Sequence, residues 1–122
     1  MHKFSTENYQ FGKRLICEGS WSKKMTKYVN ENDITEIELN HAEGWKGIKG
    51  LFESKSIKDL FIHKYEAKDM FDIGKLDNLE SLVIKVARVE TLDGIQQLKK
   101  LKKFEAAMFT KLESLLVRNN TL

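Results

Sequence analysis

The chain has 122 residues, a net charge of +3 from 21 Lys and Arg against 18 Asp and Glu, and 41% hydrophobic and 32% charged residues. This composition is typical of one globular domain, and no stretch approaches the roughly 18 apolar residues of a membrane-spanning helix. The single cysteine, Cys17, excludes an intramolecular disulfide and a cysteine-based zinc site, and it favours a reducing compartment. Residues 1–10 lack the apolar run of a signal peptide, so we expect a cytoplasmic protein that does not engage a membrane.

The first elements along the chain are predicted to be two strands of a β-hairpin. Tyr9 and Phe11 precede Gly12-Lys13, and Leu15 and Cys17 follow, which gives apolar alternation on both sides of a turn at Gly12-Lys13. Because Cys17 alternates with Leu15, we interpret it as a small buried hydrophobe rather than as a nucleophile paired with a histidine.

A short helix is predicted next. Trp21, Met25, Tyr28 and Val29 are spaced as one apolar face of a helix that begins at Ser20 or Ser22. Burial of large aromatic side chains such as these contributes roughly 1.5–3 kcal/mol each, so this face can hold the segment against a neighbouring core.

From Ile34 onward the chain repeats itself, with units that start at residues 34, 57, 79 and 101. Each unit opens with an apolar-x-x-apolar-x-apolar pattern, formed by Ile34, Ile37, Leu39; Ile57, Leu60, Ile62; Leu79, Leu82, Ile84; and Leu101, Phe104, Ala106. Two units continue at matching offsets, as Tyr65, Ala67, Met70, Ile73, Leu76 and as Ala87, Val89, Leu92, Ile95, Leu98. The alternation predicts a strand, and the later spacing of three predicts a turn of helix or 3-10 helix, with Asp93 as N-cap and Gln96 three residues on in the third unit. One unit cannot close a core, so the units must stack.

These units resemble leucine-rich repeats of the 22-residue class shared with the internalins, most fully in LESLVIKVARVETLDGIQQL at 79–98. The resemblance runs from Ile34 to the C-terminus. It implies an α/β fold, a short solenoid with a parallel sheet on the concave side, short helices or 3-10 turns on the convex side, and an N-terminal cap made by the hairpin and helix of residues 1–33. The family's asparagine position holds Ala42, Tyr65, Ala87 and Phe109, so its ladder of backbone hydrogen bonds is expected to be largely missing.

The end of the repeat region is irregular. The segment 112–122 fits the opening of a repeat, including Asn120, yet it begins 11 residues after the unit at Leu101. Either the unit at Leu101 is shortened, or residues 104–118 form an irregular hairpin; we favour two strands joined by a short link. The expected organisation is one structural domain, with a cap at 1–33 and repeats at 34–122 whose compressed last unit lies near 112.

The sequence carries no recognised catalytic motif, neither a glycine-rich phosphate loop nor HExxH, G-x-S-x-G or CxxC. Glu36, Glu38 and Asp59 should lie close together, and paired carboxylates can perform acid–base or metal chemistry, but a solvated acidic face is the favoured interpretation. His41 and His63 are on neighbouring strands and out of register, which argues against a metal site. We predict no enzymatic activity, cofactor or metal.

The outward strand residues form the candidate binding surface, because side chains alternate between the two faces of a strand. We expect Phe61 and Val83 as its apolar centre, and a rim that changes sign from the acidic cap end to Lys85, Lys103 and Arg118. The predicted partner-binding residues are Glu36, Glu38, Asp59, Phe61, His63, Val83, Lys85, Lys103 and Glu105.

Charge is unevenly distributed: residues 1–30 carry +4, 31–56 carry −3, 57–98 carry −2 and 99–122 carry +4. The most basic local patch is Lys99, Lys100, Lys102 and Lys103, which either binds nucleic acid or an acidic partner or protects a strand edge from aggregation. Our first hypothesis is a protein-binding module, similar to stand-alone bacterial leucine-rich-repeat immunity proteins whose partner is a toxin domain. Nucleic-acid binding and self-association as a weak homodimer through the C-terminal edge are the alternatives to a monomeric protein binder, and an enzyme is the least favoured.

Overall fold

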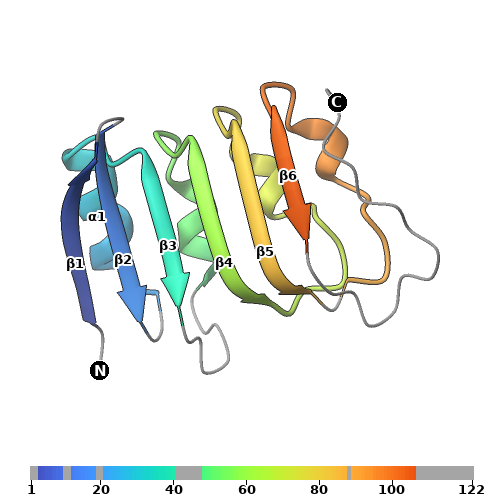
Figure 1. Cartoon of the computed structure of the whole chain (residues 1–122), viewed down its shortest axis with the longest axis horizontal. Helices are drawn as coiled ribbons and strands as arrows, with labels where there is room; N and C mark the ends of the chain where they lie inside the picture. Colours follow the sequence, from blue (N-terminus) through green and yellow to red (C-terminus); the bar gives the residue numbers. More distant parts are fainter. Residues whose placement is uncertain (1–2, 10–11, 19–20, 41–47, 88, 107–122) are drawn as a thin grey trace.

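The computed structural model describes residues 3–9, 12–18, 21–40, 48–87 and 89–106. Six strands form one sheet in chain order (Figure 1): β1 (Lys3–Tyr9), β2 (Gly12–Glu18), β3 (Glu36–Asn40), β4 (Asp59–Tyr65), β5 (Ser81–Ala87) and β6 (Lys103–Ala106). The strands β2 to β6 are all parallel, and β1 pairs antiparallel with β2 at one edge. The prediction of a parallel sheet is therefore confirmed.

All of the described helical elements lie on one side of this sheet (Figure 1): α1 (Lys23–Glu31) and three 3-10 turns, η1 (Ile48–Glu53), η2 (Ile73–Lys75) and η3 (Ile95–Gln97). The hydrophobic core fills the space between them and the sheet. The fold is thus α/β, with strands that alternate with short 3-10 turns and one α-helix in the described part of the chain. It is consistent with the short leucine-rich-repeat-like arrangement expected from the sequence.

The repeated apolar positions are the core, as the pattern predicts. The strand register pairs Ile37, Leu60, Leu82 and Phe104, so these residues lie side by side on adjacent strands. All four are at most 3% exposed. Because equivalent residues are in register, each unit places its apolar ladder directly on that of the next, which is how stacked units share one core.

Backbone hydrogen bonds reinforce this register where the strands begin. The carbonyl oxygens of Thr35, Lys58 and Glu80 each accept two N–H groups from the next unit, at 2.8 to 3.1 Å. These three carbonyls occupy equivalent positions in their repeats. The same step from one unit to the next is therefore fixed by the main chain as well as by the core.

The N-terminal elements are a hairpin and a helix, but the turn lies earlier than expected. Tyr9 pairs with Gly12, so the turn precedes Gly12 and the prediction of a turn at Gly12-Lys13 is wrong. Alternation could not fix that position, since a shift of the turn preserves the pattern downstream. The helix α1 follows its prediction, with Ser22 as N-cap and buried Met25 and Val29.

The helix α1 is fastened to the sheet and to the first repeat. The Cys17 Sγ lies 3.7 Å from the Met25 Sδ in the core. At the C-terminal end, Asp33 adopts a left-handed φ of 50°, and the Ile34 N–H donates to the Val29 carbonyl at 3.1 Å. This is the long-range bond of a Schellman motif, and it turns the chain directly into the first repeat.

One expectation about the repeats is wrong, and Tyr65 makes a contact that the sequence did not predict. The element after Leu92 is a three-residue 3-10 turn whose N-cap is Gly94, and the Gln96 Oε1 accepts from the Gly94 N–H at 2.9 Å, so the assignment of Asp93 as N-cap is wrong. Tyr65 occupies the position at which leucine-rich repeats usually have asparagine, and the hydroxyl of this buried residue donates to the Asp69 carbonyl at 2.7 Å. The tyrosine hydroxyl thus makes one side-chain hydrogen bond to the backbone at a position where an asparagine amide would usually make it.

Several predictions fall on residues outside the described ranges. They concern His41, Ala42, Phe109, Arg118 and the arrangement of 107–122, including the compressed last unit and the C-terminal edge. Within the described ranges, no helix is long and apolar enough to cross a membrane.

Candidate binding face

The side of the sheet opposite α1 and the 3-10 turns is the candidate site, and we call it the open face. It is formed by strand residues that alternate with the buried ones: Arg14, Ile16, Glu18, Glu36, Glu38, Asn40, Asp59, Phe61, His63, Ser81, Val83, Lys85, Lys103 and Glu105. All nine predicted partner-binding residues lie on this face. The strand register brings most of them into two rows across the sheet.

The central row contains the apolar residues. Glu38, Phe61, Val83 and Glu105 are successive partners on β3 to β6, and Ile16 extends the row onto β2. Phe61 and Val83 are half-buried, so Phe61 is less exposed than a protruding anchor would be. The large apolar side chain that is exposed in the described part of the chain is Phe71, at 46%, next to η2 and off the open face.

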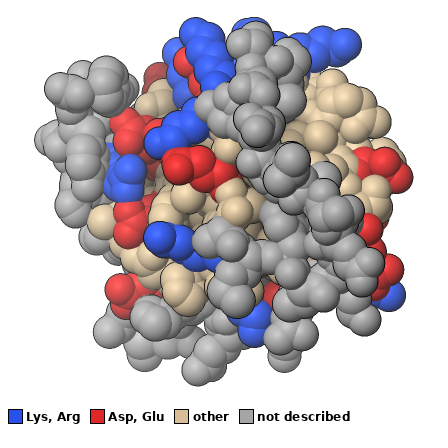
Figure 2. Space-filling model, turned by 45° about the vertical axis from the view of Figure 1, so that its right-hand side comes forward, with Lys and Arg blue, Asp and Glu red and all other residues tan. Residues whose placement is uncertain are grey.

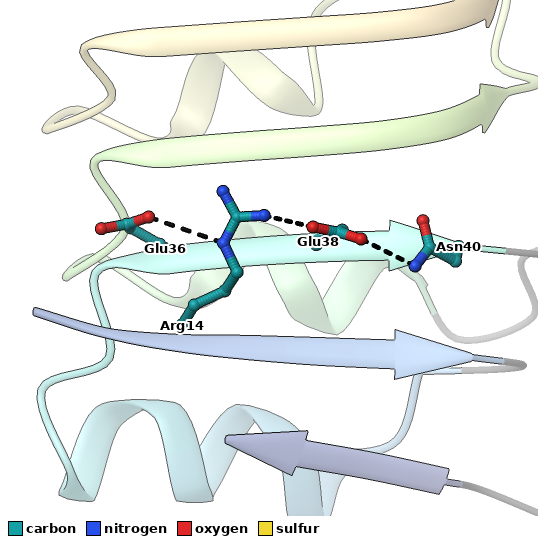
Figure 3. Close-up of polar contacts among 4 residues, drawn as sticks. All are labelled: Arg14, Glu36, Glu38 and Asn40. Carbon is teal, nitrogen blue, oxygen red and sulfur yellow. Dashed lines mark hydrogen bonds and ion pairs between the residues drawn. The ribbon is translucent and has the colours of Figure 1, made fainter. Parts of the chain in front are cut away.

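The second row lies at the start of the strands, where Arg14, Glu36, Asp59, Ser81 and Lys103 are successive partners. The Arg14 side chain crosses from β2 over β3 and lies between two carboxylates (Figure 3). Its Nη1 contacts the Glu38 Oε1, and its Nε lies 3.6 Å from the Glu36 Oε1. The Asn40 Nδ2 donates to the other Glu38 oxygen at 2.8 Å.

Arg14 changes the expected character of this end of the face. Glu36 is only 6% exposed, so the interpretation of a solvated acidic surface is wrong for this residue. The sign change expected along the rim is also interrupted, because a cation stands beside the first carboxylates. The sequence signal for Arg14 was present: it alternates with the buried Leu15 and Cys17 and so belongs to the same face as Glu36.

A polar hollow of about 300 Å³ lies beside this row. It is lined by Thr35, Glu36, Lys58, Asp59, Glu80 and Ser81, at the start of β3, β4 and β5. Partial burial raises the pKa of Asp59 above its ordinary value, and the nearby positive charges of Arg14 and Lys103 oppose that increase. Asp59 therefore sits where a negative charge is poorly solvated.

The remaining predicted residues lie at the outer parts of the face. His63 and Lys85 are exposed and follow the buried Ile62 and Ile84 on adjacent strands. Lys103 and Glu105 are exposed on β6 and form an ion pair of 3.2 Å with each other.

Most of the predicted basic patch contacts other side chains. The Lys100 Nζ donates to the Asn78 Oδ1 at 2.8 Å, and the Lys102 Nζ lies 3.9 Å from the Glu80 Oε1. Figure 2 shows Lys and Arg side chains along the upper edge of the view, the edge where the strands of Figure 1 begin, with acidic side chains next to them. The lysines thus help to join adjacent units and are interspersed with carboxylates.

Cys17, the residue considered as a nucleophile, is part of the hydrophobic core. Cys17 is fully buried, and burial, followed by the charge of Glu18, raises the pKa of its thiol to about 11. The thiol is therefore protonated at neutral pH. The described residues include no group of three or more His, Cys, Asp or Glu side chains placed to hold a metal ion.

No protein-family model, curated protein or solved structure matches the chain.

Proposed function

We propose that this chain is a non-enzymatic binding protein of the leucine-rich-repeat type that holds a protein partner on its open face. The observation that carries the proposal is the pairing of Phe61 with Val83 at the centre of that face, with Glu38 and Glu105 at the two ends of the row. An apolar centre with a charged rim is the common anatomy of protein interfaces, since the centre supplies affinity and the rim supplies orientation.

The size of the face supports a partner that reaches beyond its flat part. Five parallel strands at about 4.8 Å spacing, with a mean length of about 20 Å, give roughly 400 Å², whereas a standard interface buries about 800 Å² on each side. A partner that binds stably must also contact an adjoining edge. The edge where the strands begin carries both the hollow and the lysines, and it is the one that we expect to be used.

Within this class, the narrower proposal is a cytoplasmic immunity protein that neutralises a cognate bacterial toxin. Its support is the resemblance in cap and repeat class to stand-alone immunity proteins, together with a free and buried Cys17, which suits a reducing compartment. The proposed mechanism is occlusion of the toxin surface by steric and electrostatic contact. A neighbouring reading frame for a large secreted protein with a variable C-terminal domain would strengthen this proposal, and co-expression that fails to relieve that domain's toxicity would refute it.

The binding face is tested by capture of partners from native lysate with variant proteins. We expect Phe61→Ser and Val83→Ser to reduce capture of a specific protein at least tenfold, while Phe71→Ser, a matched change off the open face, leaves it intact. Circular dichroism and thermal unfolding confirm that each variant is folded. Equal capture by the folded Phe61→Ser and Val83→Ser variants would refute the proposal.

Nucleic-acid binding through the lysines predicts the opposite pattern. In that case, replacement of Lys99, Lys100, Lys102 and Lys103 by Gln abolishes binding, and affinity falls steeply with salt because counterions are released from phosphates. We expect the lysine variant to change the rate of association with a protein partner more than its final affinity.

A further inference from the structure

The hollow at the start of β3, β4 and β5 contains acceptor atoms that the described part of the chain leaves unused. The Glu36 Oε2 and the Thr35 Oγ1 are buried without a hydrogen-bond partner there. Glu36 is more than nine-tenths buried and faces the hollow that it lines. Asp59, its partner across the strand pair, lines the same hollow, and its side-chain carboxylate forms no hydrogen bond or ion pair with another described residue. Two neighbouring carboxylates therefore retain acceptor capacity at one place.

Three of the cations near the hollow are already paired, and Lys58 lines the hollow without forming an ion pair with Glu36 or Asp59. Arg14 is engaged by Glu38 and by the other oxygen of Glu36. Lys102 lies by Glu80 at 3.9 Å, Lys103 pairs with Glu105 at 3.2 Å, and Lys58 is exposed. A buried carboxylate oxygen without a donor is costly, so a donor-rich ligand would find an uncompensated site here.

We propose that this hollow binds a guanidinium group, supplied by an arginine side chain of the protein partner, whose N–H groups donate to the Glu36 Oε2 and the Asp59 carboxylate. This inference rests on the proposed function in one respect, namely that the arginine belongs to a protein docked on the open face. Guanidinium fits better than ammonium because it presents five donors in a plane and is more weakly hydrated. A metal ion does not fit, because the described residues offer no group of three suitable ligands.

The position of the hollow suits this role. It adjoins the apolar row, since Asp59 and Phe61 alternate on β4 and Ser81 and Val83 alternate on β5. A partner whose apolar side chain packs on Phe61 can place an arginine at the start of the strands without crossing the face. Such an arginine would supply a directional, charge-assisted contact beside the apolar centre.

The full chain can be tested without the partner by titration with methylguanidinium, followed by NMR of the amides of Glu36, Asp59 and Ser81. We expect saturable shifts confined to these residues and their neighbours, with a dissociation constant on the order of 1–10 mM. Neutral methylurea, a close match in shape, should produce no saturable shift. Equal effects of the two probes, or no saturable shift with methylguanidinium, would overturn the proposal.

Variants locate the site. Asp59→Asn and Glu36→Gln should each weaken methylguanidinium binding about tenfold, because each removes a charge-assisted acceptor. Glu90→Gln, a change of the same kind at an exposed residue away from the hollow, should leave binding unchanged. If Asp59→Asn and Glu36→Gln, both shown to be folded by their amide spectra, bind the probe as the parent does, the site is not the one proposed.

The two proposals can fail separately. Probe binding at the hollow without Phe61-dependent capture of a protein would leave the guanidinium site intact and remove the proposed function. Phe61-dependent capture of a protein, with no methylguanidinium binding at the hollow, would leave the proposed function and remove this inference.

Discussion

The first repeat unit and the three that follow it obey the same pattern and yet provide different surroundings. Glu36, Asp59, Ser81 and Lys103 each begin a strand at the same repeat position and are successive partners across the sheet. Only Glu36 is buried, because Arg14 from the preceding β2 covers it. The repeat therefore fixes the position of a side chain on its strand. The residues on the adjacent strand decide whether that side chain is buried.

The opposite side of the sheet shows the same contrast. In the first unit, η1 packs near α1, and a Cβ at Gly50 would lie 3.2 Å from the Thr26 Oγ1, a side-chain atom. In the later units, η2 and η3 approach through their main chains, and a Cβ at Gly74 would lie 2.6 Å from the Gly94 carbonyl oxygen. Regular units pack more closely against each other than the first unit packs against the cap.

The largest expected effect is the loss of a shared core position in the regular units. Leu82 is fully buried, so Leu82→Ala should lower the free energy of unfolding by about 2–5 kcal/mol, measured by urea denaturation. Leu92→Ala, at a half-buried position of the same unit, should cost less. Equal losses for the two variants would contradict the assignment of the core.

Glycine substitutions test the difference in packing directly. Gly94 has a φ of 107°, and a Cβ there would lie 2.5 Å from the Phe71 amide nitrogen. Gly94→Ala should therefore cost about 1–3 kcal/mol from the left-handed backbone alone, with the clash in addition. Gly50→Ala has no left-handed φ to strain, and its nearest contact is longer, at 3.2 Å from the Thr26 Oγ1, so it should cost less. Thermal unfolding that ranks Gly50→Ala as the more harmful change would overturn this comparison.

Arg14 is responsible for the special environment of Glu36, and its removal should expose that dependence. Arg14→Met should lower the free energy of unfolding by about 1–3 kcal/mol, because a buried carboxylate loses its nearest cation. Adding Glu36→Gln should restore part of the loss in a double-mutant cycle. Lys27→Met breaks an exposed pair with Glu31 and should cost less than about 0.5 kcal/mol. A cycle with no coupling between Arg14 and Glu36 would show that the pair is only a surface contact.

The smallest effect concerns Asp59. Its pKa is raised in the folded protein, so the native state binds the proton more tightly and the charged carboxylate disfavours folding. Asp59→Asn should therefore raise the stability slightly at neutral pH. This advantage should disappear as the pH falls through the raised pKa of Asp59 and the carboxyl becomes protonated. Urea midpoints of parent and variant, measured at neutral pH and at a pH below the raised pKa of Asp59, give the difference in stability. A variant that is less stable than the parent at neutral pH would contradict the prediction.

Much of the open face could be predicted from the sequence because alternation is a local property of a strand. The repeat placed Phe61 next to Val83 and Glu36 next to Asp59, since equivalent positions of stacked units are neighbours. The predicted positions of the hairpin turn and of the N-cap of η3 are wrong because both depend on individual backbone hydrogen bonds. The same pattern of apolar residues is compatible with several such sets of hydrogen bonds.

The sequence by itself determined the stacking of units, the buried positions and the alternation that creates an open face, because a period of 22 or 23 residues has only one way to bury its apolar ladder repeatedly. Tertiary structure alone decided that Arg14 covers Glu36, that Phe61 is half-buried and that the hollow keeps unused acceptors. These features depend on side-chain distances between strands that are more than 20 residues apart in the chain. A periodic pattern contains no information about those distances, because it describes what the units share, whereas burial and pairing follow from how neighbouring units differ.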